Sequence, residues 1–261
     1  MLPSLIPIHD ENPTERFSYV TVALIVVNVA AFVLLTPNFG IARSRCFDQA
    51  CVAQQCALEQ FFYEWGTVPA EVTEGEQLTG DLGGRCLLQP KSVILSLFTA
   101  MFLHGGFLHL AGNMLFMWIF GNNIEDRLGR FRYVIFYLAA GLAGSLAHVL
   151  LNPASQVPTI GASGAISGLL GAYIVLFPHA RIHAIVPIPF LIIFLGRLRL
   201  PAFVVLGIWF VSQFFIGGGQ QPEGGGVAWV AHVGGFVAGI ILIFVLGGWR
   251  RQRPRPSYYY G

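Results

Sequence analysis

Four polar side chains lie within long apolar stretches of the sequence, and their chemical types suit acyl transfer. Ser163 offers a hydroxyl nucleophile, and His232 offers a base. A serine is a weak nucleophile until a nearby base takes its proton. His109 and Asn113 carry side-chain N–H groups that could bind an oxyanion. The sequence therefore predicts a Ser163–His232 catalytic dyad, with His109 and Asn113 stabilising the oxyanion.

The composition is that of a membrane protein. Of the 261 residues, 55% are hydrophobic and 11% are charged, against about 25% charged residues in soluble domains. This hydrophobicity also excludes a disordered chain. The net charge is +2, and no basic run precedes the last dozen residues, so no nucleic-acid partner is expected.

Six uncharged apolar segments are long enough to cross a bilayer, which takes roughly 20 helical residues. They lie at about 17–36, 105–121, 133–151, 160–177, 200–216 and 227–248. A seventh apolar stretch, 182–196, is short and contains Pro187 and Pro189, so it is interpreted as an interfacial or re-entrant segment. The predicted fold is an all-α membrane protein, a six-transmembrane-helix bundle.

Basic residues give this bundle an orientation. With six spans, eleven of the fifteen Lys and Arg residues fall on one side, and the other four lie in the long loop 37–104. The positive-inside rule then places both termini in the cytoplasm, and we expect a plasma (inner) membrane. The domains are a cytoplasmic segment at 1–16, a membrane domain at 17–248 and a basic cytoplasmic tail at 249–261. Residues 1–16 lack the basic character of a targeting segment, so the first span is expected to remain as an anchor.

All four cysteines lie in the extracytoplasmic loop 37–104, at Cys46, Cys51, Cys56 and Cys86. On an oxidising side they could form one or two disulfides, in any of three full pairings, or remain free thiols. A metal site is the alternative, but no histidine lies among them to complete the usual zinc spacing. No metal is predicted.

The orientation also brings the polar candidates together. Spans two, four and six all enter from the extracytoplasmic side, so His109, Ser163 and His232 should lie at similar depth. Small residues let the fourth and sixth helices approach closely, and those predicted to pack are Gly164, Gly168, Gly235 and Gly239. The glycine-rich loop 217–226 has the flexible composition of a gate that admits water.

Several other polar residues in or near these segments are interpreted as structural or as lying outside the site. Ser145 and Ser167 are expected to join helices, since hydroxyl groups in membrane helices commonly do so. His148 is expected to be a satisfied packing residue, and His104 an interfacial one. The other two histidines considered, His179 and His183, belong to the predicted cytoplasmic loop.

Three short motifs resemble those of the rhomboid family of intramembrane serine proteases. They are His109-Leu110-Ala111-Gly112-Asn113, Gly161-Ala162-Ser163-Gly164 and Ala231-His232-Val233-Gly234-Gly235, in this order on spans two, four and six. The resemblance covers about 17–248 and includes Glu125-Asp126-Arg127-Leu128-Gly129, which is similar to the family's acidic-to-glycine turn motif. Two features differ from some members: Ser167 stands where they have an aromatic residue, and Trp65-Gly66 where they have Trp-Arg.

The resemblance implies a six-span fold of rhomboid type and a reaction through an acyl-enzyme. It implies that Ser163 is the nucleophile and His232 the general base, with no third acidic member and no cofactor. It further implies that His109, Asn113 and the Ser163 backbone N–H bind the oxyanion. The implied substrates are single-pass membrane proteins whose helices unwind near the outer face.

Two other classes of function share some of these sequence features. The first is a catalytically inactive rhomboid-like protein that binds membrane clients, against which the presence of both Ser163 and His232 counts. The second is a transporter with a proton relay through His109, His148 and His232. No Asp, Glu, Lys or Arg lies inside any predicted span to complete such a relay.

Overall fold

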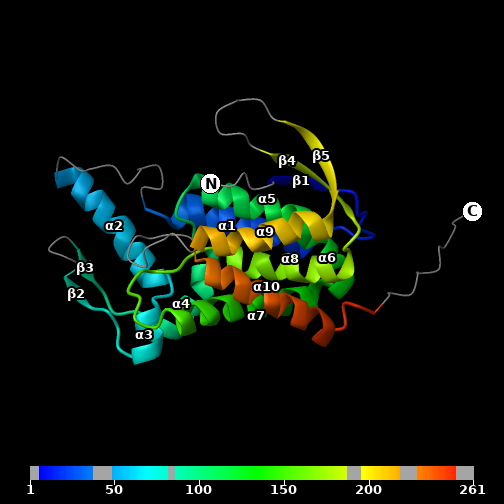
Figure 1. The fold of residues 1–261 in the computed structure, drawn as a ribbon. Helices are drawn as coiled ribbons and strands as arrows, with labels where there is room; N and C mark the ends of the chain where they lie inside the picture. Colours follow the sequence, from blue (N-terminus) through cyan, green and yellow to red (C-terminus); the bar gives the residue numbers. More distant parts are fainter. Residues whose placement is uncertain (1–5, 38–48, 82–85, 187–194, 218–227, 251–261) are drawn as a thin grey trace, which may run out of the picture.

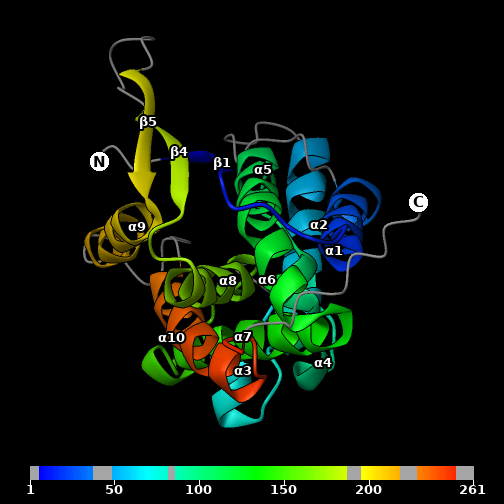
Figure 2. The ribbon, with the colours of Figure 1, turned by 90° about the vertical axis from the view of Figure 1, so that its right-hand side faces the viewer.

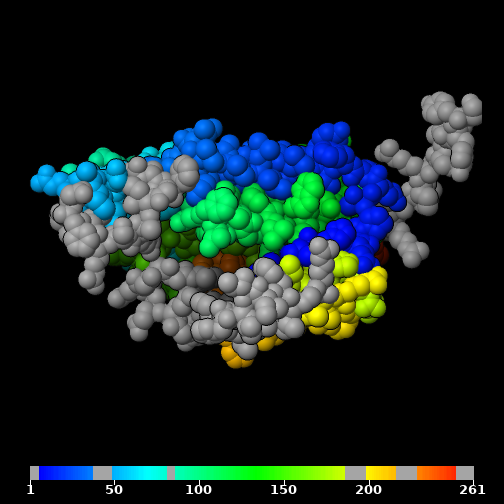
Figure 3. Space-filling view, turned by 90° about the horizontal axis from the view of Figure 1, so that it is seen from above, coloured from blue at the N-terminus to red at the C-terminus, as the bar shows by residue number. Residues whose placement is uncertain are grey.

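The computed structural model describes residues 6–37, 49–81, 86–186, 195–217 and 228–250. Most of these residues are helical, and the apolar helices run along one common direction (Figures 1 and 2). In a view from above the molecule, the first apolar helix and the helix of His109 lie side by side (Figure 3).

Each of the six predicted apolar segments contains a helix. The first is α1 (Tyr19–Ala30), continued by the π-helical turn η1 (Ala31–Leu35). The second runs through α5 (Phe107–Phe116), η3 (Met117–Gly121) and α6 (Asn122–Leu128). The others are α7 (Arg130–Leu151), α8 (Ser163–Leu176), α9 (Ala202–Gly217) and α10 (Trp229–Val245).

Judged by length and composition alone, these helices differ in their capacity to cross a membrane. In the described part of the chain, α7 is long and apolar enough by itself, with 22 residues. A second segment passes the same test only as a pair of helices, Val93–Phe102 and Phe107–Leu128, which are bent by 80° at the break between them. The other four apolar helices have between 10 and 17 residues.

Helix α8 lies at the centre of the bundle (Figure 2). All of its residues from Gly164 to Tyr173 are buried, as expected for a helix that is apolar on every side. It packs against α7, α9 and α10. The nucleophile candidate Ser163 therefore begins a helix whose next ten residues are all buried.

Glycines allow α8 and α10 to touch backbone to backbone. A Cβ atom at Gly235 would overlap the carbonyl oxygen of Gly164, and one at Gly239 would overlap that of Gly168. A Cβ atom at Gly168 would come within 2.5 Å of the Ala140 Cβ atom on α7. Gly164 itself has more space, because its nearest neighbour would be 3.7 Å away. Three of the four glycines predicted to pack thus leave no room for a side chain.

We expect Gly239→Ala to destabilise the protein by about 1–3 kcal/mol, the usual cost of overpacking a tight contact. The obstructing atoms belong to the Gly168 backbone, which cannot rotate away. Thermal unfolding in detergent would measure the loss. Gly207→Ala on α9 is the matched control, because a Cβ atom there meets nothing within 4 Å. Equal unfolding temperatures for both variants would contradict this account of the helix contact.

The loop 37–104 contains more structure than the sequence predicts. It holds α2 (Gln49–Trp65), α3 (Pro69–Glu74), the short strands β2 (Gly80–Asp81) and β3 (Leu87–Leu88), α4 (Val93–Thr99) and the 3₁₀ turn η2 (Ala100–Phe102). In Figure 1 these elements, apart from α4 and η2, gather beyond one end of the bundle.

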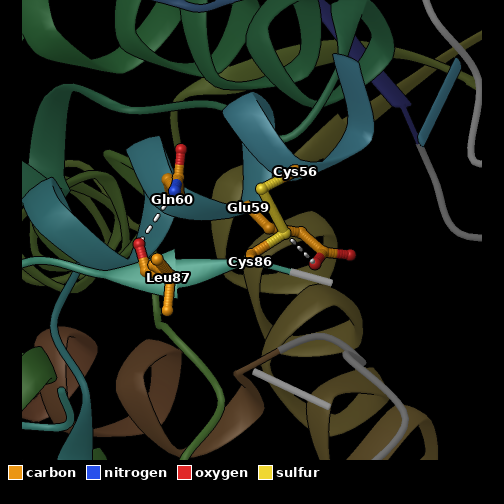
Figure 4. The surroundings of a disulfide bond; sticks show 5 residues. All are labelled: Cys56, Glu59, Gln60, Cys86 and Leu87. Carbon is orange, nitrogen blue, oxygen red and sulfur yellow. Dashed lines mark hydrogen bonds between the residues drawn. A yellow bond between two sulfur atoms is a disulfide. The ribbon is translucent and has the colours of Figure 1, made fainter. Parts of the chain in front are cut away.

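A disulfide joins two of these elements. Cys56 on α2 is bonded to Cys86, the residue before β3, with Cα atoms 5.4 Å apart (Figure 4). Beside it, the Gln60 side chain donates a hydrogen bond of 2.8 Å to the Leu87 carbonyl. Cys51 is also disulfide-bonded, and Cys46 lies outside the described residues. The sequence left open disulfides or free thiols, and the described cysteines form disulfides.

A buried ion pair holds the base of this loop together. The Lys91 ammonium lies 2.6 Å from the Glu71 carboxylate, and both side chains are almost fully buried. The same ammonium donates to the carbonyl oxygens of Tyr63 and Gly66. Burial lowers the pKa of Lys91, while the hydrogen bond and charge of Glu71 oppose that shift. The end of α2, helix α3 and the segment before α4 thus meet at one cation.

The opposite end of the bundle carries a three-stranded antiparallel sheet, which the sequence did not predict. Its order is β1 (Ile6–Asp10), β4 (Arg181–Val186) and β5 (Leu195–Pro201) (Figure 1). The stretch 182–196 thus begins and ends in strands, with 187–194 outside the described residues. Its described ends are paired strands and not parts of a transmembrane helix. Whether the stretch is interfacial or re-entrant stays a prediction.

Two buried carboxylates tie the N-terminal residues to the bundle. Asp10 accepts hydrogen bonds from the Tyr173 hydroxyl (2.7 Å) and the Asn123 amide (2.8 Å). Burial raises the pKa of Asp10, and these two bonds counter that shift. Glu125, in the predicted turn motif, accepts from the backbone N–H and the hydroxyl of Thr21 at the start of α1. A carboxylate at a helix N-terminus satisfies N–H groups that lack intrahelical partners.

Candidate active site

Ser163 and His232 are hydrogen-bonded to each other. The Ser163 Oγ atom lies 2.8 Å from the His232 Nε2 atom. Ser163 is the first residue of α8, and His232 lies in the first turn of α10. The glycine contacts between these helices bring the two side chains within reach. The predicted pair is thus a direct contact.

Gly161 provides the entry to α8. Its φ of +124° is one that residues with side chains rarely adopt. A Cβ atom there would also come within 2.9 Å of the His109 ring and 3.6 Å of Ser163 Oγ. His109 and Ser163 therefore flank the same backbone position, where only glycine fits.

His109 directs one ring nitrogen toward this position. Its Nε2 atom would lie 2.9 Å from a Cβ atom at Gly161, while its Nδ1 atom accepts a long hydrogen bond of 3.5 Å from the Gly105 backbone N–H. Since a neutral imidazole has a single N–H, the hydrogen then resides on Nε2. His109 can thus present a donor beside Ser163.

Asn113 lies one helical turn after His109, on the same face of α5. Its side chain is 7% exposed, and its amide Nδ2 has no hydrogen-bond partner in the described structure. Buried donors are seldom left unpaired, because desolvation without a partner costs about 1–3 kcal/mol. This free amide is therefore suited to bind an oxygen that arrives with substrate.

The segment that leads into Ser163 is held by the structured loop. Thr67 and Thr159 exchange two backbone hydrogen bonds, of 3.1 and 2.7 Å, and the Gly161 N–H donates to the Ala100 carbonyl. A Cβ atom at Gly66 would press on Phe62 and Ile160. The Trp65-Gly66 pair, a difference from some rhomboids, thus lies where loop and active-site segment meet.

A pocket opens beside Ser163. It is lined mainly by small residues from η2, the middle of α7, the entry segment and the starts of α8 and α10. The lining residues are Ala100, Met101, Gly141, Ser145, Thr159, Ile160, Gly161, Ser163, Gly164, Ala165, Ala228 and Ala231. The pocket thus lies directly beside the Ser163 hydroxyl and is bordered mostly by short side chains.

Two site residues on α9 were missed by the sequence analysis. The Gln213 Oε1 atom lies 2.7 Å from the His232 Nδ1 atom, and the Trp209 ring lies 6.0 Å from the His232 ring. Both come from the fifth apolar segment. The rule that polar groups inside membrane helices are costly and functional applies to Gln213 as it does to Asn113, and would have identified it.

The other polar residues lie outside this hydrogen-bonded group. Ser167 donates to the Ser163 carbonyl (2.6 Å). His148 contacts the Asn152 amide (3.4 Å). His183, on β4, contacts Glu11, the residue after β1 (2.7 Å). His104 is fully buried with its ring edge-on to that of His109. In the described ranges, no group of three or more His, Cys, Asp or Glu could hold a metal ion. Of the predicted gate at 217–226, only Gly217 belongs to the described residues.

Comparison with known proteins gives a consistent result. The family model of the Rhomboid domain matches residues 91–249. The chain is 33% identical over 152 residues to Rhomboid protein 1, mitochondrial, of Saccharomyces cerevisiae, covering 56% of this chain and 40% of that protein. It is 27% identical over 249 residues to RHOMBOID-like protein 1 of Arabidopsis thaliana, covering 93% of this chain and 58% of that protein.

A bacterial relative matches a shorter part. Over 76 residues the chain is 46% identical to the Rhomboid protease GluP of Bacillus subtilis, covering 29% of this chain and 14% of that protein. In all three cases the match covers less than two thirds of the relative's length. The family match confirms the resemblance found in the sequence and identifies an all-α membrane protein.

Proposed function

Because the chain belongs to the rhomboid family, whose members are embedded in membranes, we propose that it is an intramembrane serine endopeptidase. It hydrolyses peptide bonds in or near the transmembrane segments of single-pass membrane proteins. The observation that carries this proposal is the 2.8 Å contact between Ser163 Oγ and His232 Nε2. Two of the relatives found are named as rhomboid proteases.

The chemistry follows from the contacts around Ser163. His232 takes the hydroxyl proton as Ser163 Oγ attacks the peptide carbonyl carbon. The carbonyl oxygen becomes an oxyanion, and the N–H groups of His109, Asn113 and the start of α8 stabilise it. His232 then gives its proton to the leaving amine, which leaves an acyl-enzyme. Water, deprotonated by His232, then attacks the acyl carbon. The bond to Ser163 Oγ breaks, His232 returns the proton to that oxygen, and the second product leaves with a carboxyl end.

We further propose that the bundle spans the bilayer six times, with both termini in the cytoplasm. Large apolar side chains exposed on the helices support contact with lipid, among them Leu34, Phe107, Leu108, Phe131, Leu150 and Val245. The bias of basic residues to one side supports the orientation. The plasma (inner) membrane is part of this proposal, and the names of the relatives, both mitochondrial and bacterial, do not select a membrane.

The direct test is cleavage of a reporter by the purified protein in liposomes. The reporter is a single-pass protein whose helix is destabilised near its outer end, and an otherwise identical reporter with a stable helix is the control. Cleavage of the first reporter within or beside its transmembrane segment is expected. Binding without cleavage would favour the alternative function, an inactive rhomboid-like protein that holds membrane clients.

The six-span topology makes a separate prediction that labelling can check. A single cysteine at Gln220, in a variant lacking the native four, should react with an impermeant thiol reagent added outside intact cells. A cysteine at Gln252 should react only after permeabilisation. Both positions lie outside the described residues. Protection of the Gln220 site until the membrane is opened would place it in the cytoplasm and contradict six spans.

A further inference from the structure

We propose that Gln213 is a positioning residue that holds the His232 imidazole in the tautomer required of a base. This inference rests on the proposed protease function. The Gln213 side chain is 4% exposed, and its Oε1 atom lies 2.7 Å from His232 Nδ1. His232 is therefore bonded at both ring nitrogens, to Ser163 on α8 and to Gln213 on α9.

The surroundings of Gln213 determine which end of its amide faces His232. The amide nitrogen Nε2 donates to the Trp209 carbonyl (3.2 Å) and to the Ser212 hydroxyl (3.4 Å). The Ser212 hydroxyl in turn donates to the Trp209 carbonyl (2.6 Å). A carbonyl oxygen can only accept, so a reversed amide would set two oxygens against each other. The amide oxygen must therefore face the imidazole.

This orientation determines the tautomer of His232. An amide oxygen only accepts, so Nδ1 must carry the hydrogen of the neutral ring. The other nitrogen, Nε2, then presents its lone pair to the Ser163 hydroxyl. The opposite tautomer would put an N–H group toward Ser163 and leave two acceptors facing each other across 2.7 Å.

An amide suits this position better than a carboxylate would. An ionised carboxylate in an apolar interior has a large desolvation cost whenever the imidazole is neutral. Gln213 carries no charge, yet its oxygen can accept the Nδ1 hydrogen both before and after His232 takes the serine proton. The Trp209 ring, from the same helix, adds contact with the imidazole. Helix α9 thus supports the base without a third acidic residue.

The kinetic test compares three variants in the liposome assay. Gln213→Met keeps the length of the side chain but removes the acceptor, so kcat should fall roughly 5- to 150-fold, the effect of leaving one buried N–H unpaired, with little change in KM. Gln213→Glu retains an oxygen toward Nδ1 and should recover part of this loss. Val211→Ala, at an exposed position on the same helix, is the control. A Gln213→Met enzyme with wild-type kcat would overturn the proposal.

A spectroscopic test requires no turnover. In detergent micelles, ¹⁵N NMR of histidine-labelled protein should show His232 with a protonated Nδ1 and an unprotonated Nε2, its signal identified by loss in His232→Ala. The Gln213→Met spectrum should shift toward the Nε2-protonated form. A wild-type His232 protonated at Nε2 would refute the role of Gln213, even if the protein cleaves. Absence of cleavage with the expected spectrum would instead refute the protease function alone.

Discussion

Replacing Ser163 with alanine should abolish cleavage of the reporter while leaving the folded protein intact. In serine proteases, removing the nucleophile or the base lowers kcat by about 10⁶-fold. His232→Ala should therefore cause a loss of similar size, and the double variant should lose little more, because the two side chains act as one unit. Rates of reporter cleavage in liposomes, with unfolding temperatures measured in parallel, would test this.

Two nearby serines provide controls for the nucleophile. Ser167 lies one turn further along α8, and Ser145 lines the same pocket from α7. Ser167→Ala and Ser145→Ala should each retain most of the activity, because the structure gives neither a hydrogen bond to His232. A Ser163→Ala protein that cleaves at near the wild-type rate, or a Ser145→Ala protein that does not cleave, would show that the nucleophile has been misassigned.

Removal of the donors on α5 should have the next largest effect. Loss of one oxyanion donor in other acyl-transfer enzymes lowers kcat by about 10²–10³-fold. Asn113→Ala and His109→Ala should each approach this loss, since the free Asn113 amide and the His109 Nε2 are both available to the oxyanion. The apparent KM should change less, because the oxyanion exists only after attack.

The double variant distinguishes shared from separate roles of these donors. If both donors serve one oxygen, His109→Ala and Asn113→Ala together should cost less than the sum of their separate effects. Gly112→Ala is a matched control on the same helix, as a Cβ atom there meets nothing within 4 Å. Losses confined to KM would place both residues in substrate binding and not in oxyanion stabilisation.

The sequence was sufficient to predict the apolar helices and the contact between Ser163 and His232. A bilayer leaves few structural options for an apolar chain, so length and hydropathy place helices with little help from tertiary contacts. Polar groups inside such helices are costly, which narrows the candidates to a few residues. Small residues at the spacing of Gly164, Gly168, Gly235 and Gly239 added the prediction that the two helices touch.

The sheet and the structured loop could not be predicted in the same way. Strands β1 and β4 pair across more than 170 residues, and no local pattern in the chain encodes such a distant partner. The pairing of Cys56 with Cys86 likewise depends on where the loop folds, since sequence alone does not select among pairings. Gln213 differs, because an amide neither attacks nor takes a proton, so its type alone does not mark it as part of a catalytic site.

The bond between Asp10 and Tyr173 has a consequence for the order of events during biosynthesis. The two residues are 163 positions apart, so at about 5–20 residues per second the ribosome needs roughly 10–30 s to make the second after the first. During that interval Asp10 must remain hydrated, because burying a carboxylate without its donors is unfavourable. Strand β1 therefore stays unpaired while the first helices insert into the membrane. The end of α8 remote from Ser163 is anchored only after β4 has been synthesised, which makes docking of the N-terminal strand a late step in maturation.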